Sequence, residues 1–381
     1  MINISKLYCG LAGESDNLRY GGDSSLGPVV AYNCTARCNL NCLHCYSSSG
    51  QAGSGDELTT PQAKQLIRQL SDANCPVVLF SGGEPLLRKD LFDLLTEAKN
   101  LGLRTIISTN GTLIDSQTAD KLAGAGVSYV GVSIDGNENF HDKFRRSKGC
   151  FRAALAGIEN CQQAGLRTGL RFTITRANAK QVPATFDIAA SAGVRRTCFY
   201  HLIRTGRAAE LDRQAPTAKQ TRWVLDVITD KTRDHSKKSL VDEVLTVGNH
   251  ADGPYLLVRM QKEDNAGFEA AKNLLLANGG NRIGEKIACV GWDGSVYPDQ
   301  FWRNYPLGNI KNGTFKQIWA DTADPVLNKL RHKNNFADPR CLKCRWFTLC
   351  KGNYRFLGGD PSDKYWLNEP ACHLNDDEIK V

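Results

Sequence analysis

Short apolar runs alternate with longer helix-like stretches from residue 28 to about residue 230. Each run is rich in Val, Ile, Thr or aromatic residues, which is typical of strands that are buried on both faces of a parallel sheet. The predicted strands are PVVAYNC (28–34), PVVLF (76–80), RTIIST (104–109), YVGVSI (129–134), TGLRFTIT (168–175) and RTCFYHLI (196–203).

The stretches between these runs carry helix start and stop signals. Thr60 is expected to cap a helix that has Pro61 at its first position. Six strand–helix units predict an α/β fold with a parallel sheet, and because six units are too few for a complete eight-fold barrel, we expect a curved, partly open barrel. Later helices are expected to close on a glycine, at Gly102, Gly126, Gly165 and Gly193.

The chain changes character after residue 230. KTRDHSKKS (231–239) is expected to be an exposed linker, and IACVGWDGSVYPDQFW (287–302) predicts two strands around an Asp-Gly turn. We therefore expect four parts: an N-terminal extension (1–27), an α/β core (28–230), a bridging region (231–282) and a small second domain (283–381).

The composition, 41% hydrophobic and 23% charged, is that of an ordinary globular protein. No apolar run approaches the roughly 18 residues of a membrane span, and no secretory signal is evident, so we expect a soluble, cytoplasmic protein without a membrane partner. The formal net charge is +8, but the basic residues are scattered, which argues against a nucleic-acid partner. A mildly basic surface or an acidic small substrate explains the charge instead.

Fourteen cysteines are many for such a chain. Cytosolic thiols are seldom paired in disulfides, so clustered cysteines indicate metal or iron–sulfur ligation. One group lies near the start of the chain and a second near its end: Cys34, Cys38, Cys42 and Cys45, then Cys341, Cys344, Cys350 and Cys372. Isolated cysteines are expected to be small buried residues: Cys9, Cys75, Cys150, Cys161, Cys198 and Cys289.

The segment CNLNCLHCY (38–46) gathers three cysteines without an obvious fourth. Structural zinc needs four protein ligands, whereas a [4Fe–4S] cube held by three thiolates keeps one iron open. Cys34 could supply a fourth ligand, which leaves zinc as the alternative. It ends a predicted strand, however, where its side chain can equally point into the core.

A second motif, FSGGEP (80–85), follows the next strand. Its two glycines let a ligand approach the backbone, and Glu84 offers an acceptor for an ammonium group. In parallel α/β sheets the ligand site lies beyond the C-terminal strand ends. The loops that we expect to share one cavity are 38–45, 81–85, 109–112, 133–136 and 201–207.

The cysteine motif and SGGEP together resemble the radical S-adenosylmethionine (SAM) enzymes, over roughly residues 28–230. The resemblance implies that Cys38, Cys42 and Cys45 hold a [4Fe–4S] cluster and that SAM chelates the open iron. Reductive cleavage of SAM then yields a 5′-deoxyadenosyl radical, which takes a hydrogen atom from the substrate. SAM contacts are implied at Gly82, Gly83, Glu84, Ser133, Arg145 and Asn110.

The C-terminal cysteines resemble the SPASM extension of that family. The resemblance implies a second, fully ligated [4Fe–4S] cluster on Cys341, Cys344, Cys350 and Cys372, with structural zinc as the alternative. Asp299 and Tyr354 stand where full SPASM domains have further cysteines, so we expect one auxiliary cluster. Gln300 replaces an acidic base of sulfatase-maturating relatives, which weakens a serine- or cysteine-oxidising role, and Cys289 is expected to be structural.

Over almost its full length the chain resembles the NirJ-type subgroup of haem d1 biosynthesis, through motifs such as NHADGPYLL and PRCLKCRWFTLCKGNYR. The resemblance implies removal of propionate side chains from the iron tetrapyrrole 12,18-didecarboxysirohaem, on the way to oxo groups, with an electron donor such as a flavodoxin or ferredoxin. Side chains that could meet its carboxylates or iron are Arg171, Arg204, Arg207, His201 and His250.

Three other functions are open at this point. One is a radical SAM enzyme of the alternative haem pathway that acts on a related tetrapyrrole. Another is a SPASM-type maturase of a peptide or protein. A non-catalytic zinc or iron–sulfur binding protein is the third, and absence of SAM cleavage would favour it.

Overall fold

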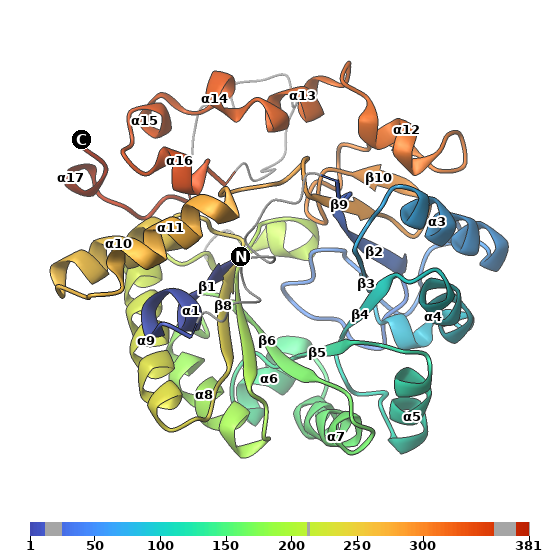
Figure 1. Ribbon diagram of the computed structural model, residues 1–381. Helices are drawn as coiled ribbons and strands as arrows, with labels where there is room; N and C mark the ends of the chain where they lie inside the picture. The colour runs from blue at the N-terminus through green and yellow to red at the C-terminus, as the bar shows by residue number, and fades with distance from the viewer. Residues whose placement is uncertain (12–24, 212–213, 354–370, 381) are drawn as a thin grey trace.

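One curved sheet forms the centre of the molecule in the computed structural model, which describes residues 1–11, 25–211, 214–353 and 371–380. In these residues the sheet has eleven strands, in the order β1-β8-β7-β6-β5-β4-β3-β2-β9-β10-β11. Strands β2 to β8 follow the chain order and are parallel to their neighbours. The sheet curves, with the helices along its outside (Figure 1).

All six predicted strands are confirmed and pair in parallel. Their outward side chains form an apolar core with the helices, in which Val30, Val78 and Ile107 have no exposed surface. The inward side chains face the interior of the open barrel. The six strands are β2 (Val29–Thr35), β3 (Val77–Gly82), β4 (Arg104–Thr109), β5 (Tyr129–Ser133), β6 (Thr168–Ile174) and β7 (Arg196–His201).

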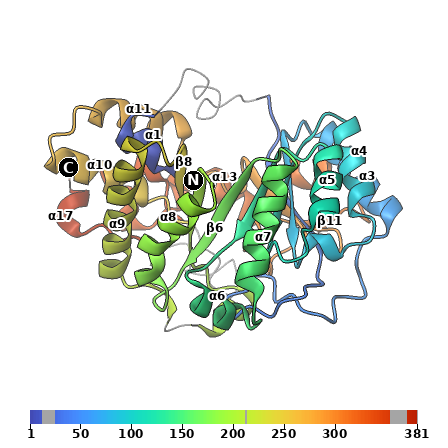
Figure 2. The same ribbon diagram turned by 90° about the horizontal axis from the view of Figure 1, so that it is seen from below.

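Helices lie along the outer face of these strands (Figure 2). The predicted glycine ends are confirmed, because Gly102, Gly126, Gly165 and Gly193 all have positive φ. The predicted cap at Thr60 is wrong by one residue: Thr59 is the N-cap of the helix that begins at Thr60, in a capping box where its backbone N–H donates to Gln62 Oε1 at 3.0 Å. The helices are α3 (Thr60–Asp72), α4 (Leu91–Asn100), α5 (Ser116–Gly124), α6 (Glu138–Arg145), α7 (Cys150–Gln163) and α8 (Val182–Ser191).

Short 3-10 helices fill the connections η2 (Pro85–Leu87), η3 (Ala179–Gln181) and η4 (Gly206–Glu210). The bridging region differs from the expectation of an irregular linker. KTRDHSKKS is mostly the end of α9 (Ala218–Lys237), where Asp234 and Lys237 are exposed while Ile228, Thr232 and His235 are buried. A seventh parallel strand, β8 (Glu243–Val247), follows, and then α10 (Asp252–Lys262) and α11 (Phe268–Asn278).

The N-terminal residues complete one edge of the sheet. Strand β1 (Ile2–Asn3) pairs antiparallel with β8, and α1 (Ile4–Cys9) packs beside it. Among the described residues no helix combines the length and the apolar character that a membrane span requires.

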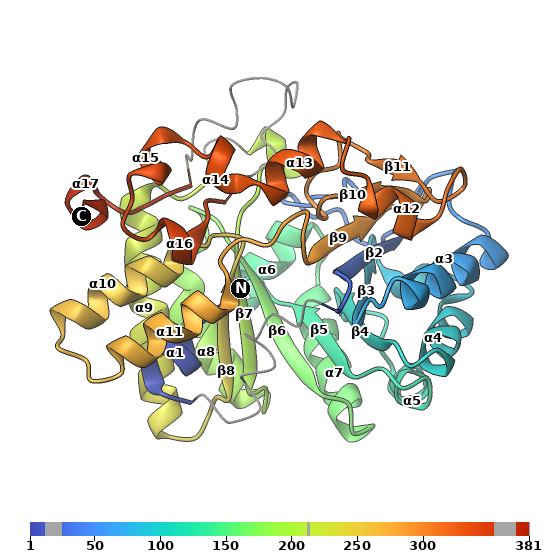
Figure 3. The same ribbon diagram turned by 45° about the horizontal axis from the view of Figure 1, so that its top comes forward.

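The C-terminal part continues the same sheet at its other edge (Figure 3). Strand β9 (Ile287–Val290) is parallel to β2, and β10 (Ser295–Tyr297) returns antiparallel, which confirms the predicted hairpin. Strand β11 (Gly308–Asn309) is last. Short helices follow β11: α12 (Phe315–Ala320), α13 (Pro325–Arg331), α14 (Lys333–Phe336), α15 (Pro339–Leu342), α16 (Phe347–Cys350) and α17 (Asp376–Ile379).

Candidate functional site

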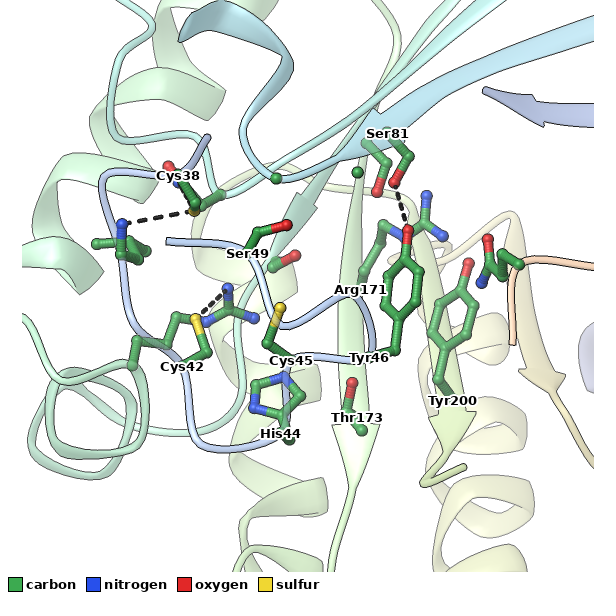
Figure 4. A pocket seen from close by; sticks show the side chains of 18 of the residues that line it. Cys38, Cys42, His44, Cys45, Tyr46, Ser49, Ser81, Arg171, Thr173 and Tyr200 are labelled. Carbon is green, nitrogen blue, oxygen red and sulfur yellow. Dashed lines mark hydrogen bonds between the residues drawn. The ribbon is translucent and has the colours of Figure 1, made fainter. Parts of the chain in front are cut away.

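An open cavity lies at the C-terminal ends of the parallel strands, where the sequence predicts it (Figure 4). All five predicted loops contribute to this main cavity, and the loop of Gln300 and Phe301 reaches it from the C-terminal part. Its space, including solvent at its mouth, is about 950 Å³, which suits a whole small-molecule ligand.

Three thiols of the loop after β2 line this cavity: Cys38, Cys42 and Cys45. Cys34 does not join them. It is fully buried in the apolar core behind the sheet, where burial raises its pKa to about 12. Zinc therefore finds no fourth ligand in Cys34.

Cys150 at the start of α7 is the cysteine that sequence reasoning missed. It packs in one group with Leu40 and the three loop cysteines, and its thiol donates to Asp142 at 3.3 Å. Its isolation in the sequence gave no signal of this proximity. Asp142 also accepts a hydrogen bond from the backbone N–H of Phe151 at 2.8 Å. The same carboxylate therefore bonds to the Cys150 thiol and to the first turn of α7.

The number of thiols favours a cluster over zinc. Structural zinc needs four protein ligands, and Cys34 does not supply the fourth. Three thiolates are enough for a [4Fe–4S] cube with one open iron, because each thiolate binds its own iron.

Arg207 fixes the cysteine loop from the far side of the barrel. Its Nε donates to the carbonyl of Cys42 and its Nη1 to the carbonyl of Ser49, both at 2.8 Å. Its backbone N–H donates to the carbonyl of Cys45 at 3.0 Å. The guanidinium expected to meet substrate thus has its donors turned to the loop, which makes Arg207 a positioning residue.

The SGGEP turn lies directly against the cysteine loop. A Cβ on Gly83 would stand 2.0 Å from the carbonyl oxygen of Arg37, so only glycine permits this approach. Gly82 and Gly83 line the main cavity. Their contact with SAM stays a prediction, which requires that the backbone of both glycines can be reached from the cavity.

Glu84 is fully buried behind this turn. Its carboxylate accepts hydrogen bonds from Thr109 Oγ1 and the Asn110 backbone at 2.8 Å, and from the Leu86 backbone at 3.3 Å. Burial raises its pKa, against these three bonds. Glu84 therefore ties SGGEP to STNGT, and its predicted ammonium contact stays untested.

A buried ion pair borders the cavity beside the cysteines. Arg145 donates to Asp135 through Nη2 at 2.6 Å and Nε at 2.9 Å, while its Nη1 points to Cys42 Sγ at 3.8 Å. Burial opposes the charge on Asp135, but Arg145 and then His44 lower its pKa to about 2. Burial lowers the pKa of His44 to about 4, and its ring stacks on Phe144. Arg145 thus carries its own counter-ion.

Two further predicted contacts line the main cavity. Ser133 ends β5, and Asn110 follows β4. The Asn110 amide donates to Asn39 Oδ1 at 2.8 Å and points to Cys38 Sγ at 4.0 Å. Asn110 thus lies between the cysteine loop and the STNGT turn.

The four C-terminal cysteines line one small pocket together, as predicted. Arg340 Nη1 donates to Cys372 Sγ at 3.3 Å, and the Trp346 backbone donates to Cys344 Sγ at 3.4 Å. Such donors stabilise thiolates on a cluster. Four thiols are enough to ligate a cluster fully, without an open coordination site.

Asp299 and Cys289 lie apart from this four-cysteine pocket. Asp299 accepts the backbone N–H groups of Phe301 at 2.7 Å and Trp302 at 3.1 Å. Cys289 is fully buried and accepts from Asn33 at 3.5 Å, so it is structural as expected. Tyr354 lies outside the described residues.

A second cavity, with about 720 Å³ of space, separates the two cysteine sites. Arg204 and Cys372 line it, and His201 and Leu202 line both it and the main cavity. His201 Nε2 contacts the buried Asp252 carboxylate at 2.8 Å. His250 is buried, and its backbone N–H donates to Asn353.

Family models match both parts of the chain. Residues 32–189 match the radical SAM superfamily, and residues 282–345 match an iron–sulfur cluster-binding domain. The chain belongs to the radical SAM family and is an enzyme whose cofactors are iron–sulfur clusters and SAM.

Within that family it belongs to the haem-synthesis enzymes. It is 44% identical to the Fe-coproporphyrin III synthase of Methanosarcina barkeri, over all of this chain and 99% of that protein. It is 36% identical to the pre-heme d1 synthase of Dinoroseobacter shibae, over 91% of this chain and 86% of that protein. The haem d1 prediction is therefore confirmed only as far as haem-type synthesis.

Solved structures share the fold at lower identity. Streptococcus suis SuiB bound to its precursor peptide has a TM-score of 0.72 at 16% identity, over 94% of this chain and 79% of that one. The protein anSMEcpe with bound AdoMet and Cp18Cys peptide has a TM-score of 0.68 at 20% identity, over 93% of this chain and 96% of that one. The partial barrel with a C-terminal cluster domain is thus confirmed as the fold.

Proposed function

We propose that this enzyme removes carboxylate side chains from the iron tetrapyrrole 12,18-didecarboxysirohaem, and that the acetate chains are lost to give an Fe-coproporphyrin III product. One observation carries the choice of product: 44% identity over all of the chain to an Fe-coproporphyrin III synthase. Loss of propionate chains, as in haem d1 formation, is the second candidate, supported by 36% identity over 91% of the chain.

The residues of the main cavity fit the cofactors of this reaction. Cys38, Cys42 and Cys45 would hold a cluster with one open iron, and the backbone of Gly82 and Gly83 would meet the methionine end of SAM. Bound there, cluster and SAM supply a 5′-deoxyadenosyl radical that takes a hydrogen atom from substrate.

The side chains of the protein hold the cysteine loop in place and exclude water from the cavity. Arg207 fixes the loop through the carbonyls of Cys42 and Ser49. Arg145 is neutralised by Asp135, so it adds no uncompensated charge beside Cys42. Apolar and aromatic side chains such as Leu40 and Phe301 narrow the cavity and exclude water from a reactive radical.

The electron donor stays a prediction. A flavodoxin or ferredoxin would have to deliver electrons to the cluster. A second, fully ligated cluster in that pocket would suit electron transfer to or from the substrate.

The test is an anaerobic turnover of cluster-reconstituted enzyme with SAM, a reductant and 12,18-didecarboxysirohaem. Mass spectrometry follows both 5′-deoxyadenosine and the macrocycle. Loss of acetate chains supports the proposal, and loss of propionate chains moves it to the haem d1 reaction. The two products differ by one CH2 for each chain removed, so they are resolved by mass.

A matched control is the Cys42→Ala variant, reconstituted in the same way. It keeps the four C-terminal cysteines but lacks a ligand in the main cavity. If wild-type enzyme cleaves SAM and leaves the tetrapyrrole unchanged and unbound, the tetrapyrrole assignment is wrong and a peptide substrate replaces it.

A further inference from the structure

Arg171 on β6 extends into the barrel interior and lines the main cavity. Its guanidinium lies over the ring of Tyr200 on the neighbouring strand, 4.7 Å from the ring centre. Figure 4 places both side chains beside Tyr46, away from Cys38. The cation therefore lies in the part of the cavity opposite to that cysteine.

Arg196 on β7 provides an internal comparison. Its guanidinium stacks on Tyr129 at 4.8 Å, almost the same geometry, but it also pairs with Glu243 at 2.7 Å. Among the described residues Arg171 has neither an ion-pair partner nor a hydrogen bond from its guanidinium. Arg171 is partly buried and lines the cavity, so its guanidinium is a cation that an anion entering the cavity can reach.

The Arg171 side chain lies against a glycine of the neighbouring strand. A Cβ at Gly131 of β5 would stand 2.8 Å from Arg171 Cδ and 3.3 Å from its Nη1. Any larger residue at position 131 would push the guanidinium out of its place above Tyr200. The position of the cation is thus set by the neighbouring strands β5 and β7, rather than by a flexible loop.

The predicted SAM contacts lie at two distances from Arg171. Gly82 and Gly83 lie at the end of β3, whereas Ser133 ends β5 and is the register partner of Arg171. A carboxylate of SAM is therefore the rival anion for Arg171, and the SAM affinity of the variants below separates the two. Gln300 and Phe301 come from the C-terminal part and line the cavity, and Phe301 packs edge-on against Tyr46 at 5.5 Å. The cation therefore faces the half of the cavity that the C-terminal part helps to close.

We propose that Arg171 binds a side-chain carboxylate of the tetrapyrrole and so sets which side chain faces the radical. The inference rests on the proposed function, because it takes its anion from that substrate. The fork of the guanidinium matches a carboxylate in two hydrogen bonds, which a lysine cannot reproduce. Arg171 is in this account a specificity-determining residue.

Equilibrium binding of ferric 12,18-didecarboxysirohaem to reconstituted enzyme, followed by its absorbance, tests the inference. Arg171→Met is expected to raise the Kd at least about thirtyfold, and Arg171→Lys about tenfold. Arg196→Lys is the matched control, because it keeps the pair with Glu243, and its Kd should stay within about twofold. SAM binding should be unchanged in all three variants.

A double-mutant cycle with the methyl ester of the tetrapyrrole sharpens the result. Esterification should raise the Kd of wild type and of Arg196→Lys. It should change the Kd of Arg171→Met little, because that variant has already lost the contact between the guanidinium and the carboxylate. Equal ester effects in all three proteins would overturn the inference, as would a loss of SAM affinity in Arg171→Met. If wild type fails to bind the tetrapyrrole at all, the proposed function fails as well, and the two failures are thereby distinguished.

Discussion

The two cysteine sites of this enzyme both present thiol sulfur atoms, but one site adjoins an open cavity and the other is closed. In the main cavity three thiols stand on one loop, open to about 950 Å³ of space. In the C-terminal pocket four thiols close around a far smaller space lined by Trp346 and Phe347. The number of thiols and the size of the adjoining space differ together, which is what a reactive and a fully ligated cluster require.

The two sites share one kind of support and differ in another. Both have donors at sulfur: Arg340 donates to Cys372 Sγ at 3.3 Å in the closed site, and the Leu40 backbone donates to Cys38 Sγ at 3.4 Å in the open one. The open loop is also held through its backbone, because Arg207 donates to the carbonyls of Cys42 and Ser49.

The largest effect should come from the open site. Cys42→Ala should abolish SAM cleavage, because one of only three ligands is lost and no neighbour replaces it. The measurement is 5′-deoxyadenosine formation under anaerobic, reducing conditions. Cys34→Ala is the matched control, since Cys34 lies in the core, and it should retain cleavage. Cleavage by Cys42→Ala at the wild-type rate would contradict the ligand assignment.

Removal of a ligand from the closed site should separate the two activities. Cys350→Ala should keep SAM cleavage but lose tetrapyrrole turnover, and iron should fall from about eight to about four per chain. Iron analysis and parallel assays of deoxyadenosine and macrocycle check this. Zinc in place of iron after reconstitution of wild type would show that the pocket is a structural zinc site instead.

Substitution of Arg207 or of Arg340 should increase the rate of cluster loss at one site only. Arg207→Lys loses one of two charged hydrogen bonds to the loop, so a chelator should remove the open-site cluster about tenfold faster. Arg340→Lys should accelerate loss only from the closed site. Iron release, monitored by absorbance, measures both rates. Faster iron loss from both clusters in either variant would contradict the assignment of one arginine to each site.

The smallest effect concerns Asp299, which stands where a further cluster ligand would be expected. Burial raises its pKa to about 6, against the two backbone bonds from Phe301 and Trp302. Because the folded pKa exceeds the ordinary value of 3.8, its ionisation destabilises the protein as pH rises through about 6.

Asp299→Asn keeps the acceptor oxygen and removes this ionisation. Its Tm should exceed that of wild type by a few degrees at about pH 7.5, and the gain should shrink as pH falls towards about 5. Iron content should stay at the wild-type value. A loss of iron would instead identify Asp299 as a cluster ligand.

Much of this molecule is predictable from its sequence, because local signals and the fold agree. The six strands carry β-branched apolar runs, and the parallel rule then brings their following loops to one cavity. The bridging region escaped prediction because α9 has a heavily charged C-terminal end, which is typical of an exposed linker.

The site itself was less predictable than its location. Spacing identifies Cys38, Cys42 and Cys45, but the contact of Cys150 with them depends on tertiary packing. Likewise, Arg171 and Arg207 look alike in the sequence. Only the structure shows that one faces the cavity with no counter-ion in the described residues while the other holds the loop.

The central claim is that one cluster is open to SAM and the other is closed. Electron paramagnetic resonance of the reduced enzyme, recorded with and without SAM, tests it directly, with Cys42→Ala and Cys350→Ala used to assign the two signals. The signal that survives in Cys350→Ala should change when SAM is added, and the signal that survives in Cys42→Ala should not. A response of both signals, or of neither, would contradict the account.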